Sequence, residues 1–186
     1  MKVLLIRHGQ TIGNLHKRYI GRTDEPLCSE GIKALKCTEI PECDVVIASP
    51  MKRCIQTAGI LFPGAEPTLC SDLRECDFGD FEGKNYLELS GDSDYQRWID
   101  SGGTLPFPGG ESPENFRLRC IRAFSEIVDQ HKQARCIALV VHGGTIMSIM
   151  SHYGVPKKAY FSWNVPNGHG FICQFKQNSL IVMERI

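Results

Sequence analysis

The N-terminal segment constrains the fold of this chain most strongly. Residues 3–6 (Val-Leu-Leu-Ile) are a short apolar run of the kind that forms a buried strand. Arg7 and His8 follow directly, and Gly9 then offers backbone angles that are closed to other residues. Ligands of open α/β sheets bind at the carboxyl ends of the strands. A permanent cation beside an imidazole at that position indicates chemistry on an anion.

Other apolar runs of the chain are also followed by residues suited to chemistry. The predicted strands, with the polar residues that follow them, are 44–49 with Ser49 and Arg53, 68–70 with Arg74 and Glu75, and 136–141 with His142. Parallel strands joined by crossover helices present their carboxyl ends at one edge of a sheet. Two histidines, two arginines and one glutamate are therefore expected to meet there, although they are spread over most of the sequence.

Helical patterns and turn residues fill the segments between these strands. The expected helices are 30–39 with Ser29 as N-cap, 50–61 opened by Pro50, 86–89, 94–101, 112–131 and 143–152. Residues 10–26 contain several Gly, Asn, Asp and Pro residues and are expected to form a loop. Two final strands, 170–176 and 180–185, meet at a tight Gln177-Asn178 turn, which predicts an antiparallel edge.

The size and composition of the chain suit one globular domain over residues 1–186. Hydrophobic residues make up 42% and charged residues 23% of the sequence, which are ordinary values for a globular protein. A formal net charge of zero gives no reason to expect binding to nucleic acid or to an anionic membrane surface. No apolar run approaches the length of a membrane span. Because Met1 and Lys2 lead straight into the first strand, we expect no secretory leader and a cytoplasmic protein.

The cysteines and the other histidines match no disulfide or metal-ligand pattern, and we expect no cofactor. The nine cysteines are odd in number and form no C-x-x-C pair, so we expect reduced thiols in the protein interior, with a reactive cysteine or a zinc site as the alternatives. Four further histidines match no metal-ligand spacing, and they are His16, His131, His152 and His169. For His169, which lies in a glycine-rich loop, the alternative is a minor substrate contact.

Residues 76–110 are expected to form a lid-like insertion over one end of the sheet. The stretch is rich in Asp, Gly and Glu, and a long irregular segment in a compact domain usually has a functional reason. Between Asn85 and Gly109 the only basic residue is Arg97. Its aromatic residues could line a substrate pocket or simply pack, and they include Phe81, Tyr86 and Trp98.

The predicted cluster of side chains suits phosphoryl transfer without a metal. The transferred group carries its charge on three equatorial oxygens, so catalysis mainly needs positioned cations and an in-line nucleophile. Arginine presents a rigid fork of donors that matches phosphate. A neutral histidine can attack phosphorus and form a phosphohistidine. A carboxylic acid can protonate the leaving alkoxide and then act as a base toward water. A metal-dependent hydrolase would instead need clustered histidine and carboxylate ligands.

Five stretches of the sequence resemble landmarks of a known family. They are Leu5-Ile-Arg-His-Gly-Gln-Thr11, the segment 49–58, the segment 73–83, Pro108-Gly-Gly-Glu-Ser112 and Val140-Val-His-Gly-Gly144. Taken in this order, they resemble the histidine phosphatase superfamily in its phosphoglycerate mutase-like branch. The resemblance implies an α/β fold, a three-layer α/β/α sandwich around a mixed, mainly parallel sheet.

The resemblance also implies roles for individual residues. His8 would be the phosphorylated nucleophile. Glu75 would be the acid and base, although three other carboxylates lie nearby in the sequence and could serve instead, namely Asp77, Asp80 and Glu82. The phosphate pocket would consist of Arg7, Arg53, His142 and Gly143, with further polar and backbone contacts from Asn14, Gly21 and Thr23. His142 would be protonated when phosphate is bound. Glu111 and Ser112 could be no more than helix-capping residues.

The family contains both phosphatases and mutases. Mutases carry additional basic residues in the insertion, whereas this insertion is poorly basic, so the prediction is a phosphatase acting on a small phosphorylated metabolite. The alternatives are mutase-type phosphoryl transfer and a phosphate-binding module without catalysis. Length and motifs most resemble small bacterial members, α-ribazole-5′-phosphate phosphatases among them. Met147 stands where the family often has arginine, and Phe81 where tryptophan is common. The sequence leaves the natural substrate open, as well as the choice between monomer and dimer.

Overall fold

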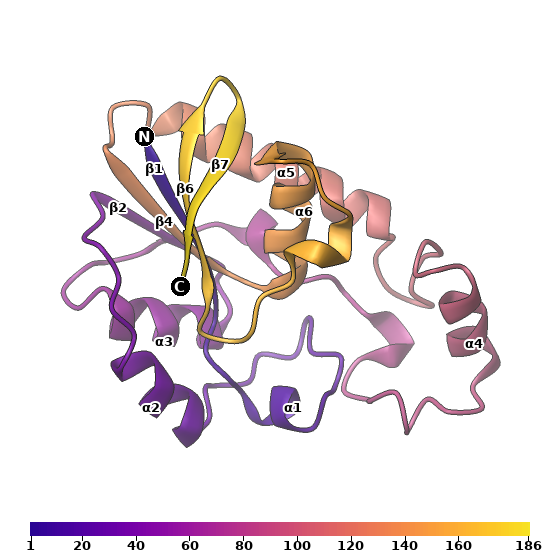
Figure 1. The fold of residues 1–186 in the computed structure, drawn as a ribbon. Coiled ribbons are helices and arrows are strands. Elements are labelled where there is room, and N and C mark those ends of the chain that lie inside the picture. Colours follow the sequence, from indigo (N-terminus) through magenta and orange to yellow (C-terminus); the bar gives the residue numbers. More distant parts are fainter.

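The computed structural model describes residues 1–186, which form a seven-stranded sheet in the order β3-β2-β4-β1-β6-β7-β5 (Figure 1). The strands are β1 (Lys2–Arg7), β2 (Val45–Ala48), β3 (Thr68–Leu69), β4 (Cys136–Val141), β5 (Gly154–Val155), β6 (Gly170–Lys176) and β7 (Ser179–Arg185). The first strand of the chain thus lies at the centre of the sheet, flanked by β4 and β6.

Four of the strand pairings are parallel and two are antiparallel. β1 runs parallel to β4, β2 is parallel to both β4 and β3, and β5 is parallel to β7. β6 runs antiparallel to β1 and to β7. The mixed, mainly parallel sheet is therefore confirmed. The antiparallel hairpin is not its edge as predicted, because the two-residue strand β5 pairs with β7 and lies outside it.

Helices cover both faces of the sheet and give the predicted three-layer sandwich (Figure 1). They are α1 (Ile12–Leu15), α2 (Ser29–Lys36), α3 (Lys52–Leu61), α4 (Ser93–Asp100), α5 (Pro113–Gln130) and α6 (Gly143–Tyr153). Three short 3₁₀ helices cover Ser71–Leu73, Gly79–Phe81 and Tyr160–Trp163. No helix combines the length and the apolar character needed to cross a membrane.

Side chains of β4 show how the sheet is buried on both faces. Ile137, Leu139 and Val141 belong to the apolar cluster that contains residues of α5 and α6. Ala138 and Val140 belong to the cluster on the other face, with residues of α2 and α3. Alternation along the strand sends successive side chains into opposite layers, so a fully apolar strand is required between two helical layers.

Several element boundaries differ from the sequence prediction. Cys28 caps α2, not Ser29, because its Sγ accepts from the amide of Gly31 at 3.3 Å. The helix ends at Lys36, before Pro41. Helix α3 begins at Lys52 rather than at Pro50. The predicted loop 10–26 contains the one-turn helix α1, which Thr11 caps.

No helix forms at residues 86–89, in contrast to the prediction. The side-chain oxygen of Asn85 accepts from the amides of Leu87 and Glu88, both at 3.0 Å. A side chain that takes these amides favours a turn over a helix. The neighbouring 3₁₀ helix Gly79–Phe81 was not predicted.

The insertion packs against the body of the protein through its own apolar cluster. Cys76, Phe81, Leu89 and Phe107 are buried together against residues of α5 that include Phe116. The insertion is therefore packed against α5 and is not an unsupported irregular segment. Its movement as a lid stays a prediction.

All nine cysteines are free thiols in the structure, and eight of them are buried or half-buried, whereas Cys37 is exposed. Cys43 and Cys136 are in contact, with 2.9 Å between their sulfur atoms.

Candidate active site

The carboxyl ends of three neighbouring strands bring the predicted polar residues together. Arg7 ends β1 and His8 follows it, Ser49 follows β2, and His142 follows β4. The rings of His8 and His142 meet edge to face, with 5.2 Å between their centroids. Nε2 of His142 lies 2.8 Å from Oγ of Ser49. Parallel pairing of β1, β2 and β4 produces this meeting point, as expected for an open α/β sheet.

His8 is held in one tautomer and one charge state. Its ring is almost fully buried, and Nδ1 lies 2.7 Å from the carbonyl oxygen of Gly9. A carbonyl oxygen can only accept, so Nδ1 carries the proton and Nε2 keeps its lone pair. Burial, followed by the charges of Arg53 and Arg7, holds the pKa of His8 well below its usual range. The free protein therefore presents a neutral imidazole with an unprotonated Nε2.

His142 is the second buried imidazole and is fully inaccessible to solvent. It caps the N-terminus of α6 and touches Ser49 and, through a weaker 3.6 Å contact, the sulfur of Cys54. Burial and the neighbouring charge of Arg53 hold the pKa of His142 well below its usual range. The lowered pKa values favour the neutral form of both rings in the free protein.

Arg7 and Arg53 supply two guanidinium groups with unsatisfied donors. Arg53 is fully buried and donates to the carbonyls of Thr23 at 2.7 Å and Gly21 at 2.9 Å. Arg7 donates to the carbonyl of Val165 at 2.8 Å. The Nε atoms of both arginines are buried without any hydrogen-bond partner. Buried orphan donors are rare in proteins, and an oxyanion would satisfy them.

Glu75 is the carboxylate that the structure brings to these cations. Its two oxygens accept from the amides of Cys76 at 3.0 Å and Gly144 at 3.1 Å. Loss of water raises the pKa of this carboxyl, and this effect outweighs the two amide bonds and the attraction of Arg7 and Arg53. A carboxyl with a raised pKa stays protonated closer to neutral pH and can act as an acid.

The other nearby carboxylates have different partners. Asp77 accepts from the amide of Gly79 at 2.9 Å, and Glu82 accepts from the amides of Gly21 and Thr23, both at 2.9 Å. Among the acidic residues that the sequence offered as alternatives, none lines the cavity beside Arg7 and Gly143, whereas Glu75 does. The geometry therefore favours Glu75.

Glycine is required where α6 approaches Glu75. A Cβ at Gly144 would lie 2.4 Å from Oε1 of Glu75, so any side chain there would displace the carboxyl. Gly143 opens α6, and its Cα lies beside the guanidinium of Arg7, where a Cβ would meet the group at 3.4 Å. The positive end of the α6 dipole at this point favours an anion.

Asn14, Gly21 and Thr23 lie in loops next to the site, and their backbone and side-chain contacts tie these loops down. Oδ1 of Asn14 accepts from the amide of Asn167 at 3.0 Å, and Asn167 also donates to the carbonyl of His8 at 3.2 Å. Gly21 passes so close to the next segment that a Cβ would lie 1.9 Å from the carbonyl oxygen of Cys76. In the structure these three residues hold the loops next to the site in place. Their direct contact with phosphate stays a prediction.

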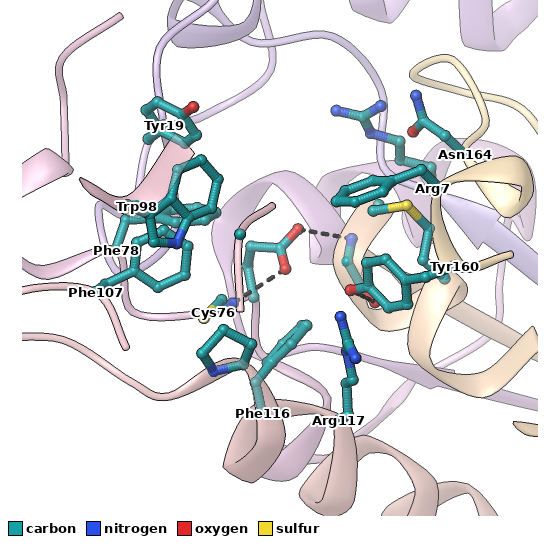
Figure 2. A pocket seen from close by; sticks show the side chains of 17 residues that line it. Arg7, Tyr19, Cys76, Phe78, Trp98, Phe107, Phe116, Arg117, Tyr160 and Asn164 are labelled. Atoms are coloured by element: carbon teal, nitrogen blue, oxygen red, sulfur yellow. Dashed lines mark hydrogen bonds between the residues drawn. The ribbon is translucent and has the colours of Figure 1, made fainter. Parts of the chain in front are cut away.

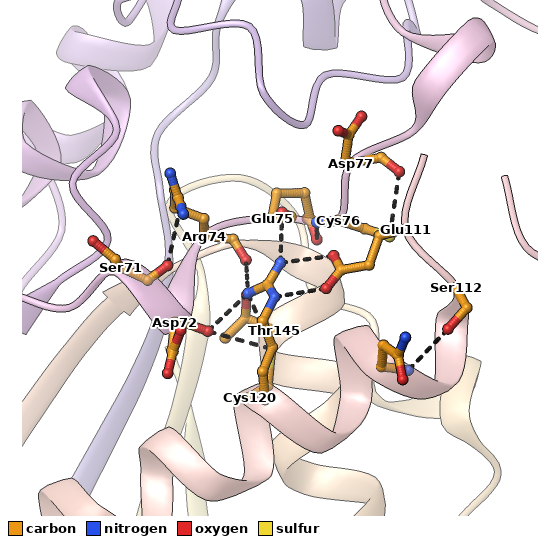
Figure 3. Close-up of polar contacts among 12 residues, drawn as sticks. Ser71, Asp72, Arg74, Glu75, Cys76, Asp77, Glu111, Ser112, Cys120 and Thr145 are labelled. Carbon is orange, nitrogen blue, oxygen red and sulfur yellow. Dashed lines mark hydrogen bonds and ion pairs between the residues drawn. The ribbon is translucent and has the colours of Figure 1, made fainter. Parts of the chain in front are cut away.

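An ion pair that sequence reasoning missed holds the backbone of Glu75 (Figure 3). Arg119 of α5 binds both carboxylate oxygens of Glu111, at 2.8 and 2.9 Å. The same guanidinium donates to the carbonyls of Asp72, Arg74 and Glu75, at 2.7, 2.8 and 3.0 Å. Glu111 is therefore more than a helix-capping residue. Nothing in the sequence indicates this pairing, because the carbonyls it reaches are more than forty residues away.

A cavity of about 240 Å³ opens beside Arg7, Glu75 and Gly143 (Figure 2). One wall is aromatic and comes mainly from the insertion, with Tyr19, Phe78, Trp98 and Phe107. The opposite wall contains Arg117, Tyr160 and Asn164, and Met147 also lines the cavity. The more deeply buried His8, Arg53 and His142 are not part of the lining. Of the aromatic residues suggested by the sequence, Trp98 lines the cavity, Phe81 packs beneath it and Tyr86 is exposed.

The chain is similar to known proteins in sequence and in fold. A family model described as the histidine phosphatase superfamily (branch 1) matches residues 3–184. A 2,3-bisphosphoglycerate-dependent phosphoglycerate mutase of Gloeobacter violaceus is 32% identical over 161 residues, which are 80% of this chain and 73% of that protein. The adenosylcobalamin/α-ribazole phosphatase of Escherichia coli is 26% identical over 178 residues, which are 90% and 87% of the two chains. The crystal structure of the α-ribazole phosphatase of Shigella flexneri has a TM-score of 0.86 at 24% identity, covering 98% of this chain and 94% of that one.

The orphan donors predict that inorganic phosphate stabilises the folded protein through Arg7. At a phosphate concentration of one hundred times the dissociation constant, the free energy of unfolding should rise by about 2.7 kcal/mol. Thermal unfolding of wild type in phosphate, against chloride of equal ionic strength, measures this gain. Arg7→Met should remove most of it, whereas Arg97→Met, a change on the exposed face of α4, should keep it. Equal stabilisation of all three proteins would contradict an anion site at Arg7.

Proposed function

The chain belongs to the histidine phosphatase superfamily, as its motifs predicted, and we propose that it is a metal-independent phosphomonoester hydrolase acting through a phosphohistidine on His8. The observation that carries this proposal is the hydrogen bond from Nδ1 of His8 to the carbonyl of Gly9. It leaves a neutral ring with a free Nε2 lone pair beside two arginines whose buried Nε donors lack partners.

In the first step, Nε2 of His8 attacks phosphorus while the bond from phosphorus to the leaving oxygen breaks. Glu75 gives its proton to that oxygen, so the leaving group departs as a neutral alcohol. Arg7 and Arg53 stabilise the charge on the equatorial oxygens, and the amide end of α6 at Gly143 adds to this. His142 takes up a proton when the anion enters, because the negative charge offsets the cost of burying an imidazolium.

In the second step, water attacks phosphorus and the bond from phosphorus to Nε2 of His8 breaks. The Glu75 carboxylate, left ionised by the first step, accepts the proton of the attacking water. Phosphate leaves, and the electron pair of the broken bond returns to Nε2. Both residues are then in their starting states, so the cycle needs no metal and no other cofactor.

The opposite pKa shifts of His8 and Glu75 make the first step feasible near neutral pH. A nucleophilic imidazole must be neutral and an acid must be protonated, and in water few pH values satisfy both conditions well. Burial lowers the pKa of His8 and raises the pKa of Glu75. The two neutral forms therefore coexist over a wider pH range than they would in water.

Hydrolysis is favoured over mutase-type transfer by the character of the cavity wall. A phosphoglycerate mutase must hold a substrate with a carboxylate and a second phosphate. Here the insertion presents Phe78, Trp98 and Phe107 to the cavity and no cation. Arg117 of α5 is the one cation besides Arg7 in the lining, which is too few for both a carboxylate and a second phosphate. Its one basic residue between Asn85 and Gly109, Arg97, lies on exposed α4 in an ion pair with Asp94.

An aromatic wall supports a substrate whose leaving group contains a ring or another flat apolar part. Tyr19, Phe78, Trp98 and Phe107 can stack on or surround such a group. Nε1 of Trp98 is buried without a partner and offers a donor to it. The substrate is a small phosphorylated metabolite, and α-ribazole 5′-phosphate is a first compound to test, alongside a broader metabolite panel with 3-phosphoglycerate.

Replacement of His8 tests the covalent mechanism. Wild type should hydrolyse p-nitrophenyl phosphate in excess EDTA and, when quenched during turnover of labelled substrate, carry an acid-labile phosphoryl group on His8. His8→Ala should lose both, with turnover lower by a factor of about 10⁴ or more, because the nucleophile is gone. His16→Ala, a change at an exposed histidine, should keep both. No hydrolysis by wild type in EDTA, or a phosphoryl group on another residue, would sink the proposal.

Glu75→Gln tests the acid role through leaving groups and pH. Alkyl phosphates need protonation of a basic leaving oxygen, so their turnover should fall by about 10² to 10⁴, and that of aryl phosphates by much less. In wild type the rate for an alkyl phosphate should decline as pH rises through the raised pKa of Glu75, since the acid is then ionised.

This alkaline decline should disappear in Glu75→Gln and persist in the control Asp80→Asn, which alters the exposed carboxylate nearby. Profiles of kcat against pH for wild type, Glu75→Gln and Asp80→Asn measure this alkaline decline. Equal losses on alkyl and aryl substrates would show that Glu75 is not the acid.

A further inference from the structure

Arg117 brings an additional cation to the cavity, on the side opposite the aromatic wall (Figure 2). It comes from the start of α5 and lines the cavity together with Glu75, Met147 and Asn164. Its guanidinium carbon lies 4.2 Å from the centroid of the Tyr160 ring. No pattern in the sequence indicates this position, because Arg117 lies outside the insertion and outside the five stretches that resemble the family.

The guanidinium of Arg117 has no polar partner in the protein. It takes part in no hydrogen bond and no ion pair, and its Nε is buried and unsatisfied. The other two arginines of α5 are both paired, Arg119 with Glu111 and Arg122 with Asp72 and Glu126. A half-buried cation without a counter-ion lowers stability, and such a group is expected where a ligand supplies the missing charge.

Tyr160 fixes where Arg117 points. Its ring lies under the guanidinium, and its hydroxyl donates to the carbonyl of Gly144 at 3.3 Å. The amide of the same Gly144 donates to Glu75 at 3.1 Å. The first turn of α6 therefore positions both residues. Gly144 binds Glu75 through its amide, and its carbonyl binds Tyr160, on whose ring Arg117 lies. Since Glu75 protonates the leaving oxygen, Arg117 lies on the side of the leaving group rather than of the phosphate.

We propose that Arg117 forms an anion subsite for a carboxylate on the leaving group of the substrate. This rests on the hydrolase function proposed above and narrows its substrate class to phosphomonoesters of acids with a ring or another apolar body. The fork of guanidinium donors matches a carboxylate. The apolar body lies against the aromatic wall that includes Trp98 and Phe107. A neutral leaving group, such as α-ribazole, would leave Arg117 without a partner.

Aromatic phosphate esters that differ only in charge test the subsite. The substrates are 2-, 3- and 4-carboxyphenyl phosphate, each compared with the carbamoylphenyl phosphate of the same substitution, which is neutral and nearly equal in shape. The quantity measured is the ratio of kcat/KM for the acid to kcat/KM for the amide. Comparison of this ratio between proteins cancels the intrinsic reactivity of the two esters.

For at least one of the three isomers, the ratio should be about tenfold or more lower in Arg117→Met than in wild type, mainly through KM. Arg117→Lys keeps the charge but loses the fork, and it should recover part of the preference. Arg122→Met, a change to an exposed arginine of the same helix, should behave as wild type. If Arg117→Met does not fold, Arg117→Lys tests the subsite by itself. The ratio of kcat/KM for the acid to kcat/KM for the amide must then be lower in Arg117→Lys than in wild type.

Two results separate failure of the subsite from failure of the function. If wild type hydrolyses these esters and the ratio is the same in wild type and in both Arg117 variants, the subsite is wrong and the hydrolase function stands. If wild type hydrolyses neither these esters nor p-nitrophenyl phosphate, the hydrolase function is wrong, and the subsite falls with it.

Discussion

A single hydrogen bond, from Nδ1 of His8 to the carbonyl of Gly9, decides what the site can do. It selects the tautomer with a free Nε2, and the burial of the ring keeps that nitrogen unprotonated. The Gly9 peptide is itself held, because its amide donates to Oγ1 of Thr57 at 2.9 Å. Thr57 in turn donates to the carbonyl of Arg53 at 2.6 Å. The orientation of the His8 ring is thus coupled to α3, the helix that carries Arg53.

The rest of the site is assembled by arginines that bind backbone carbonyls. Arg53 holds the loop at Gly21 and Thr23, and Arg119 holds the segment from Asp72 to Glu75. Each guanidinium satisfies several carbonyls that no helix or strand uses, so loops with little regular structure become rigid. Rigid loops keep the cations and the acid in place before a substrate arrives, and such preorganisation supplies much of the stabilisation of a transition state.

Local patterns in the sequence predicted what local chemistry determines. Apolar runs identified β1, β2 and β4, and the polar residues at their ends meet as expected. One local detail was wrong, because Cys28 rather than Ser29 caps α2 by accepting from the amide of Gly31. The parts that were missed depend on distant contacts, since Arg119 finds its carbonyls through the packing of α5 on a segment more than forty residues away. The cavity position of Arg117 likewise follows from the stacking of its side chain on Tyr160, forty-three residues later. No rule of residue spacing in the sequence predicts such contacts between distant residues.

The account depends most directly on the protonation state of His8 in the free protein. Nitrogen-15 NMR of the imidazole rings, with His8→Gln used to assign the signals, measures this state at pH 7. The account predicts a neutral ring with the proton on Nδ1 and an unprotonated Nε2, and a ring pKa below that of a free imidazole. An imidazolium at pH 7, or a neutral ring with the proton on Nε2, would contradict it, because neither form can attack phosphorus.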